Sequence, residues 1–366
     1  MPVPTETLWI MEPHTRAKHE ILRRYLGAWF GIMGRTNPRI VYFDGFSGPG
    51  RYKGGEEGSP LISLKLALEH HSKNNLREGT FIFIEERKDR VEHLINEINC
   101  LAIPQSFHVN VQQNQFEDTL ANILDHLDKT GAKIAPTFAF IDPFGFKGAP
   151  YKLVKRLLKN SKTEVFINIM ADSINRFLDH PDQQITQHIT NLFGTPKVLQ
   201  VIQGNGDRIK QLRELYQKQL EDCAKFVRYF EMRDDNNRPI YYLFFATNNR
   251  LGHAKMKVAF WKVDRSTGFR FSDATNPDQL VLFEMDPSAE IAHDLVKKYR
   301  GQQVSVAIIK TYIEDETPYI ESHLKKALRV LEDQGELCAE PCKQNGEKRR
   351  KHTFSDDVVL AFQPLN

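Results

Sequence analysis

The sequence predicts a doubly wound, mostly parallel α/β sheet with an antiparallel hairpin at its edge, followed by a C-terminal winged helix-turn-helix. Three observations support this prediction. Short apolar runs alternate with helical stretches between residues 39 and 170, which is typical of a parallel sheet with right-handed crossovers. Two apolar runs then flank a turn-rich segment, and the end of the chain changes to three helices and a strand pair. We expect domains at residues 1–282 and 283–366.

The N-terminal half provides the alternating elements. Residues 12–33 should form an amphipathic helix, because Ile21, Leu22, Tyr25 and Leu26 recur at helical spacing with basic residues between them. Residues 39–44 form a β-rich run that ends in a glycine-rich turn. Further strands are expected at 80–85, 107–111, 137–141 and 164–170, and further helices at 61–71, 89–98, 116–127 and 154–158.

The C-terminal half is less regular. Residues 172–225 are mostly helical and polar, so we interpret them as an insertion after the fifth strand. The runs 226–232 and 241–247 flank a turn and predict the antiparallel hairpin. Beyond residue 283, Thr317 and Pro318 are a suitable N-cap and first residue for the third helix of the winged helix. Its helices are expected at 290–299, 304–313 and 318–334, and its strands at 336–339 and 353–362.

Composition narrows the class of protein. The chain has 366 residues, 40% of them hydrophobic and 27% charged, and a formal net charge of only +3, so it does not have the strongly basic balance typical of many nucleic-acid binders. No signal-peptide pattern or long apolar run is present, and four cysteines are few for this length, so a cytoplasmic location is expected. Cys338 and Cys342 with His352 lack a fourth ligand and the usual spacing, so we expect no metal.

A candidate ligand-binding turn follows the first strand. Asp44 ends that strand and precedes Gly45, Gly48 and Gly50, at the place where an open α/β sheet binds its ligand. Glycines there let the backbone approach a ligand closely, although a plain tight turn would also explain them. Glu85 ends the second strand and is the candidate partner for a ribose hydroxyl, the alternative being a solvated strand end.

The end of the fourth strand carries the candidate catalytic residues Asp142, Pro143 and Phe144. Asp142 and a backbone carbonyl could hold a planar amino group while Phe144 stacks on it, which would direct the nitrogen lone pair toward a methyl donor. This arrangement suits methylation of an exocyclic nitrogen, and on a nucleic acid the base would have to be flipped or unpaired. A purely structural turn is the alternative.

Taken together, several segments resemble the three-Cys-motif partner protein family. They are residues 13–19, 40–52, 57–61, 140–145 and 174–177, and the similarity extends over most of the chain. The resemblance implies a Rossmann-like methyltransferase fold that binds S-adenosylmethionine (SAM), with Lys18 near the cofactor. It also implies that a three-Cys-motif protein is encoded nearby, often in mobile-element or defence-like settings. The expected cofactor-binding residues are Lys18, Asp44, Gly45, Phe46, Ser47, Gly48, Gly50, Glu85, Gln115 and Phe116.

Three functions remain open from the sequence. The first is SAM-dependent methylation of a nucleic-acid base, with DNA or RNA bound by basic residues of the winged helix, although a solvated loop would explain the basic run equally well. The second is a non-catalytic SAM- or nucleotide-binding partner subunit, since Phe144 and Gly145 depart from the Asp/Asn-Pro-Pro-Tyr/Phe tetrad of amino-methyltransferases. The third is methylation of a small molecule or protein, with residues 172–225 as a lid. The candidate nucleic-acid-binding residues are Lys325, Lys326, Arg329, Lys348, Arg349, Arg350 and Lys351, with Lys343 in the same loop.

Overall fold

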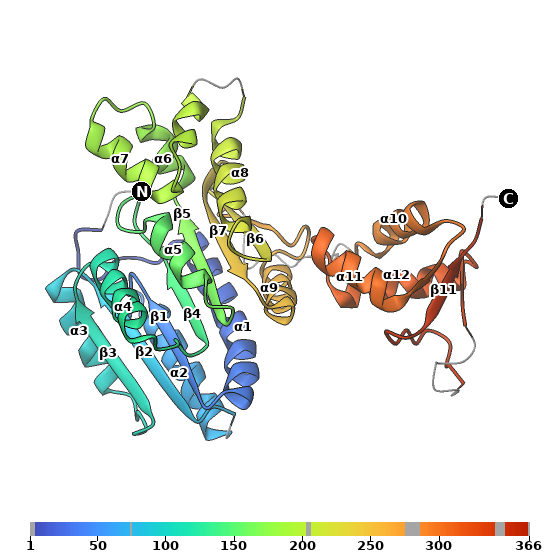
Figure 1. Cartoon of the computed structure of the whole chain (residues 1–366), viewed down its shortest axis with the longest axis horizontal. Helices are drawn as coiled ribbons and strands as arrows, with labels where there is room; N and C mark the ends of the chain where they lie inside the picture. Colours follow the sequence, from blue (N-terminus) through green and yellow to red (C-terminus); the bar gives the residue numbers. More distant parts are fainter. Residues whose placement is uncertain (1–3, 74, 203–205, 275–285, 341–347, 365–366) are drawn as a thin grey trace. The chain divides into compact units, whose positions relative to one another are not determined.

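A computed structural model describes the chain except residues 1–3, 74, 203–205, 275–285, 341–347 and 365–366 (Figure 1). The chain divides into two compact units. The first unit comprises Met1–Val263 and Phe269–Gln279, and the second comprises Asp264–Gly268 and Leu280–Asn366. The boundary expected at residue 282 falls outside the described residues.

An eight-stranded sheet forms the centre of the first unit. Its strands are β1 (Arg39–Asp44), β2 (Glu78–Glu85), β3 (Phe107–Gln113), β4 (Thr137–Ile141), β5 (Thr163–Ile169), β6 (Phe226–Arg233), β7 (Pro239–Thr247) and β8 (Arg270–Ser272). The order is β3-β2-β1-β4-β5-β7-β6-β8, and only β7 runs antiparallel to its neighbours. The sheet is therefore doubly wound and mostly parallel, which is the Rossmann-like architecture that the sequence predicts.

Helices cover both faces of this sheet (Figure 1). They are α1 (Pro13–Thr36), α2 (Ser59–Ser72), α3 (Lys88–Asn99), α4 (Phe116–Thr130), α5 (Tyr151–Leu158), α6 (Ala171–Phe177), α7 (Gln183–Phe193), the 3-10 helix η1 (Pro196–Ile202), α8 (Arg208–Glu221) and α9 (Arg250–Val263). The α1, α2, α3 and α9 helices pack with one face, and α4 to α8 pack with the other. Along β4, Phe138 and Phe140 belong to the first core and Ala139 and Ile141 to the second, which is the alternation of a strand buried on both sides.

The expected hairpin forms from β6 and β7, and a further short strand, β8, extends the sheet beyond it although the sequence did not predict that strand. The β7 strand inserts between β5 and β6, and the short strand β8 pairs with β6 on its outer side. The insertion after β5 is helical, as expected. The α9 helix was not predicted either, although Met256, Ala259 and Phe260 recur on its buried face.

The second unit is a winged helix. It contains α10 (Ser288–Tyr299), β9 (Gln303–Ser305), α11 (Val306–Glu316), α12 (Glu321–Asp333), β10 (Leu337–Ala339) and β11 (Val359–Phe362), with its strands ordered β10-β11-β9. The prediction that α12 begins at Thr317 and Pro318 was wrong. The Thr317 hydroxyl donates to the carbonyl of Ile313 at 2.7 Å and so closes α11, and Ile320 is the N-cap of α12.

Candidate active site at the carboxyl edge of the sheet

The predicted catalytic and cofactor-binding residues of the first unit meet at one edge of the sheet. Strand β1 pairs with β2 on one side and with β4 on the other, and all three are parallel. Their carboxyl ends therefore bring Asp44, Glu85 and Asp142 to the same edge. The connection after β1 turns to one face and the connection after β4 turns to the other, so this edge is the switch point at which doubly wound sheets bind ligands.

Backbone hydrogen bonds attach the turn after β1 to both neighbouring strands. The amide of Gly45 donates to the carbonyl of Phe140 in β4 at 2.9 Å. The amide and the hydroxyl of Ser47 both donate to the carbonyl of Ile84 in β2, each at 2.9 Å. The Ser47 hydroxyl is thus engaged within the protein, and its role is to hold the turn in place.

Three glycines of this turn are required by geometry. Gly48 and Gly50 have φ values of +62° and +83°, which side chains other than glycine rarely adopt. A Cβ on Gly50 would lie 2.7 Å from the Leu94 side chain, and one on Gly45 would lie 2.4 Å from the Phe116 ring. The turn is therefore a close-packed backbone cradle whose shape depends on these glycines.

Asp44 is fully buried beneath this cradle. Its carboxylate accepts hydrogen bonds from the amide of Phe46 at 3.3 Å and the hydroxyl of Tyr42 at 3.4 Å. Burial raises the pKa of Asp44 to about 7, helped by the negative charge of Asp142 and opposed by hydrogen bonds from Ser59, Phe46 and Tyr42. A buried carboxyl group with this pKa favours a cationic ligand group beside it, because a cation would stabilise its charged form.

Glu85 lies on the other side of the cradle. It is 9% exposed, and its carboxylate accepts a hydrogen bond from the amide of Arg87 at 2.9 Å. Burial raises its pKa, and the hydrogen bond from Arg87 opposes that rise. Asn114 donates its amide to the Glu85 carbonyl at 3.2 Å, which brings the exposed N-cap residue Gln115 to the same edge. Glu85 and Gln115 thus both lie at the carboxyl edge of the sheet, at the strand ends predicted from the sequence.

Phe116 was expected to contact the cofactor, but its side chain is not accessible to a ligand. It is 1% exposed, and its ring packs 5.3 Å from Phe46 and 5.9 Å from Phe43, directly behind Gly45. The ring therefore belongs to the core, because a helix that starts at a buried position turns its first apolar side chain inward. Its contribution is to support the cradle from below.

Asp142 stands at the end of β4 in a network that the sequence only partly indicated. Its two carboxylate oxygens are bound by different partners: Lys18 from α1 forms an ion pair with one, and the Asn168 side chain donates to the other at 2.8 Å. Lys18 is 5% exposed and lies 5.5 Å from the centre of the Tyr241 ring. Pro143, next in the chain, is buried. This partly buried ion pair fixes the position of the carboxylate at the edge of the cradle.

An aromatic cluster closes the space between the cradle and the Asp142 turn. The Trp9 ring packs edge-on against Tyr52 at 5.5 Å and against Phe144 at 5.9 Å, and Arg90 lies 4.6 Å from its centre. Phe144 remains 39% exposed. The carbonyl of Trp9 accepts from the amide of Lys53 at 2.9 Å. The cluster therefore presents one accessible ring next to Asp142.

Trp9 belongs to a segment that we call the N-terminal strap, residues 4–11. The guanidinium of Arg87 donates to the carbonyl of Thr5 at 2.6 Å, and that of Arg90 donates to the carbonyl of Pro4, also at 2.6 Å. Both arginines follow Glu85 closely in the chain. The strap has no periodicity and no motif, so nothing in the sequence predicted that it would lie over this edge.

A histidine–aspartate pair joins α1 to β8 at the same edge. The Nδ1 atom of His14 lies 2.7 Å from an oxygen of Asp273, which follows β8, and the Tyr241 hydroxyl donates to the His14 carbonyl at 3.3 Å. Because Asp273 follows a strand of only three residues, no local sequence pattern predicts this pair. Burial raises the pKa of Tyr241 well above its usual value, and the negative charges of Asp142 and Asp273 add to this rise.

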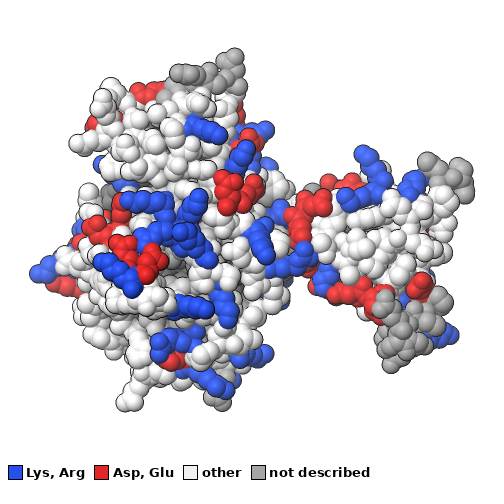
Figure 2. Space-filling view, in the orientation of Figure 1, with Lys and Arg blue, Asp and Glu red and all other residues white. Residues whose placement is uncertain are grey.

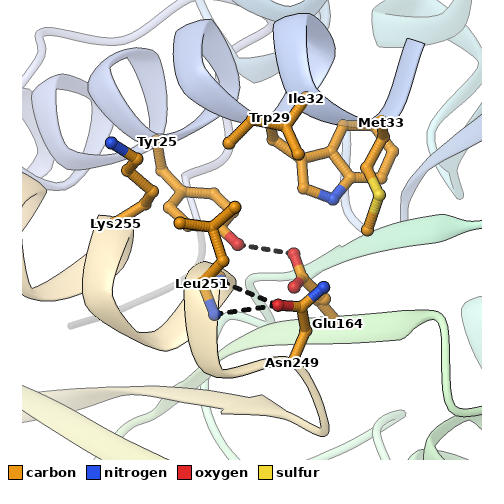
Figure 3. Close-up of a pocket in the computed structure, with 9 residues that line it drawn as sticks. Tyr25, Trp29, Ile32, Met33, Glu164, Asn249, Leu251 and Lys255 are labelled. Carbon is orange, nitrogen blue, oxygen red and sulfur yellow. Dashed lines mark hydrogen bonds between the residues drawn. The ribbon is translucent and has the colours of Figure 1, made fainter. Parts of the chain in front are cut away.

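A separate buried carboxylate lies at the opposite, amino edge of the sheet (Figure 3). Glu164, the second residue of β5, accepts hydrogen bonds from the Tyr25 hydroxyl at 2.5 Å and the Thr247 hydroxyl at 3.0 Å. Asn249 caps α9 by accepting from the amides of Leu251 at 2.9 Å and Gly252 at 3.3 Å. Burial raises the pKa of Glu164 to about 7. This cluster ties α1 and α9 to β5 and is remote from the candidate site.

In the second unit, the candidate nucleic-acid-binding residues of α12 are exposed. Lys325 pairs with Glu321 at 2.6 Å and Lys326 pairs with Asp286 at 3.1 Å. Arg329 is exposed on the same helix. Because exposed ion pairs of this kind contribute little and exchange readily, all three cations remain accessible to an anionic partner.

The basic run of the wing divides into two kinds of side chain. Lys348 and Arg350 are exposed, and Lys351 pairs with Asp333 at 2.6 Å while keeping 64% of its side chain exposed. The Arg349 side chain is only 8% exposed and forms an ion pair with Glu332. Contrary to the prediction, Arg349 is a structural residue, because its guanidinium already satisfies a buried carboxylate.

Two predictions concern residues that the structure does not cover. Cys342 and Lys343 lie outside the described residues. Within the described ranges, no group of three or more His, Cys, Asp or Glu side chains has a metal-binding arrangement. No helix of the described chain is both long and apolar enough to cross a bilayer.

Known proteins resemble the chain in part. A family model described as a GMT-like wHTH domain matches residues 270–344. Among solved structures, Trm1 from Pyrococcus horikoshii in complex with SAM is 10% identical, with 98% of this chain and 93% of that chain covered at a TM-score of 0.34. A protein from Klebsiella pneumoniae assigned as an O-methyltransferase is 11% identical, with 65% and 91% covered at a TM-score of 0.31. No curated protein matches the chain.

Proposed function

We propose that the first unit is a SAM-dependent methyltransferase that acts on an exocyclic amino group of a nucleic-acid base. The observation that carries this proposal is the position of Asp142. Its carboxylate stands at the end of β4, next to the glycine cradle at the end of β1, and is held by Lys18 and Asn168. A methyl acceptor bound by Asp142 would therefore adjoin a ligand in the cradle.

The residues at the cradle fit SAM. Gly48 and Gly50 let the backbone approach the ligand, Asp44 offers a buried carboxyl group for the ammonium of the methionine part, and Glu85 offers acceptors for the ribose hydroxyls. The exposed Gln115 amide matches the hydrogen-bonding edge of an adenine. When bound, SAM supplies an electrophilic methyl group.

The Asp142 carboxylate has lone pairs to spare for an amino group. An ionised carboxylate offers about four acceptor positions, and Lys18 and Asn168 occupy one on each oxygen. The exposed ring of Phe144 offers a stacking surface for a base, and Pro143 makes the turn between them rigid. A base held in this way orients its amino nitrogen, and a duplex substrate would have to flip it out.

A second candidate function is a non-catalytic SAM-binding subunit that works with a three-Cys-motif protein. The observation that favours it is the packing of Phe144 against Trp9, which fills part of the space where the amino-methyltransferase tetrad would hold a base. In either case we propose that Arg329, Lys348 and Arg350 of the winged helix bind nucleic-acid phosphates.

Transfer of labelled methyl groups from SAM to DNA and RNA tests the proposal. Wild type should label a polymer, and Asp142→Ala should lose transfer by about a hundredfold or more while SAM affinity, measured by calorimetry, changes little. Glu164→Gln at the opposite edge is the control and should retain transfer. SAM binding without transfer to any polymer would favour the second candidate, and the absence of SAM binding would refute both.

A further inference from the structure

A basic surface on the first unit belongs neither to the candidate active site nor to the winged helix. Residues 147–162, which contain α5 and the segments that flank it, include six basic residues and no acidic one. They are Lys147, Lys152, Lys155, Arg156, Lys159 and Lys162. The chain as a whole is almost balanced at +3, so this segment concentrates charge that the overall composition does not show.

The basic residues share one face of α5. Lys152, Lys155, Arg156 and the C-cap residue Lys159, which keeps a helical backbone conformation, are spaced i, i+3, i+4 and i+7, so they lie on a single stripe. The opposite face is apolar and buried in the core. Because the buried face fixes the rotation of α5, the basic stripe has to point outward. We call these four residues, with Lys147, the α5 stripe.

Acidic residues neutralise only part of the α5 stripe. Lys152 pairs with Glu117 at 3.4 Å, and Arg156 lies between Asp125 and Asp128 of α4 at 2.8 Å and 2.7 Å. By contrast, Lys147, Lys155 and Lys159 are exposed and have no ion pair with any residue in the described part of the chain. Three cations are therefore available to an external anion.

The stripe begins beside the candidate active site. Lys147 follows the Asp142 turn, and its neighbour Gly148 lies against the cradle residue Phe46, with 3.7 Å between the Cβ position and the ring. From there α5 runs toward the amino edge of the sheet, where Lys162 donates to the Asn37 side chain at 3.0 Å. Figure 2 shows basic side chains gathered over this part of the first unit, beside a smaller acidic group.

We propose that the α5 stripe binds the phosphate backbone of a nucleic-acid strand and leads one of its bases to Asp142. An eight-residue helix is about 12 Å long, a distance that roughly three to four phosphates of a duplex strand cover. A row of lysines along one line matches a linear polyanion. This inference deepens the proposed function. That the bound strand is the methyl acceptor rests on the proposed function.

Binding of labelled oligonucleotides without SAM tests the stripe separately from catalysis. The variant Lys155→Gln/Lys159→Gln removes two exposed charges from α5 and its C-cap and keeps good helix formers there. Lys255→Gln/Lys262→Gln is the matched control, because it removes two exposed charges from α9 on the other side of the sheet. Fluorescence anisotropy against salt should be recorded for single-stranded DNA, single-stranded RNA and duplex DNA.

The expected result is a weaker affinity, by about tenfold at low salt, and a shallower salt dependence. The slope of log K against log salt should fall by about 1.4 to 1.8 for the α5 variant and remain unchanged for the control. The slope sums all phosphate contacts, so contacts made by the winged helix do not hide the loss. An unchanged slope, or a loss of binding to anionic lipid vesicles but not to oligonucleotides, would overturn the proposal, whether or not the protein transfers methyl groups.

Discussion

Lowering the pH should weaken SAM binding, because the proposed ammonium partner Asp44 then becomes protonated. Asp44 is fully buried, and burial raises its pKa from 3.8 to about 7. A rise of about three pKa units corresponds to about 4 kcal/mol against the charged form in the ligand-free protein. A cationic ligand group next to the carboxylate offsets part of that free energy, so SAM binds the ionised form more tightly.

The sign and size of the effect follow from this linkage. Above about pH 7 the carboxyl group is already ionised and the affinity should be constant. Below that pH, binding has to release a proton, so the dissociation constant should rise by about tenfold per pH unit. Asp44→Asn should weaken binding at high pH and remove most of the pH dependence.

Isothermal titration calorimetry measures both quantities. Titrations at about pH 6 and pH 8, in buffers of different ionisation enthalpy, give the dissociation constant and the number of protons released. Glu164→Gln is the matched control, because burial also raises the pKa of Glu164 to about 7 but this residue lies at the other edge of the sheet. Equal affinities at the two pH values with no proton release would refute the assignment of Asp44.

Three further predictions concern stability and local motion. Replacing Glu164 by Gln should stabilise the protein at about pH 8 by up to about 3 kcal/mol in urea unfolding and give no gain at about pH 4. The reason is that the pKa of Glu164 is about 7 in the folded protein and 4.5 in the unfolded chain, so ionisation of the buried carboxyl group costs stability as the pH rises. Lys18→Met should destabilise the protein by about 3 kcal/mol in the same assay by leaving Asp142 without its counterion, and the double variant with Asp142→Asn should recover part of the loss. Trp9→Ala should increase amide hydrogen exchange of the N-terminal strap several-fold, since the indole contacts are lost; unchanged exchange would show that the backbone hydrogen bonds alone hold the strap.

Strand ends could be predicted from the sequence, and so could the residues that stand on them. Asp44, Glu85 and Asp142 each follow an apolar run that is buried on both faces, and the turn residues after them are unmistakable. These three residues come together because β4 lies next to β1. The alternation of strands and helices does not by itself predict that neighbour; it follows only if the sheet has the doubly wound topology.

Contacts made across long sequence separations could not be predicted in this way. The Lys18–Asp142 pair joins residues 124 positions apart, and the His14–Asp273 pair joins residues 259 positions apart. A lysine on an amphipathic helix reads as a surface residue unless the packing of that helix is known. The same reason explains the error at Arg349, whose partner Glu332 lies on α12 and carries no local signal.

The position of β7 constrains the order in which the first unit can be completed during synthesis. Strand β5 is buried along its whole length, and one of its two edges pairs with β7, which is translated only after the helical insertion and β6. Until residues 239–247 have left the ribosome, a strand that is buried in the finished fold has an unpaired edge, the kind of surface that promotes association with other chains. Fragments that end before β7 should therefore aggregate, and an expression boundary for the isolated first unit has to lie beyond this strand.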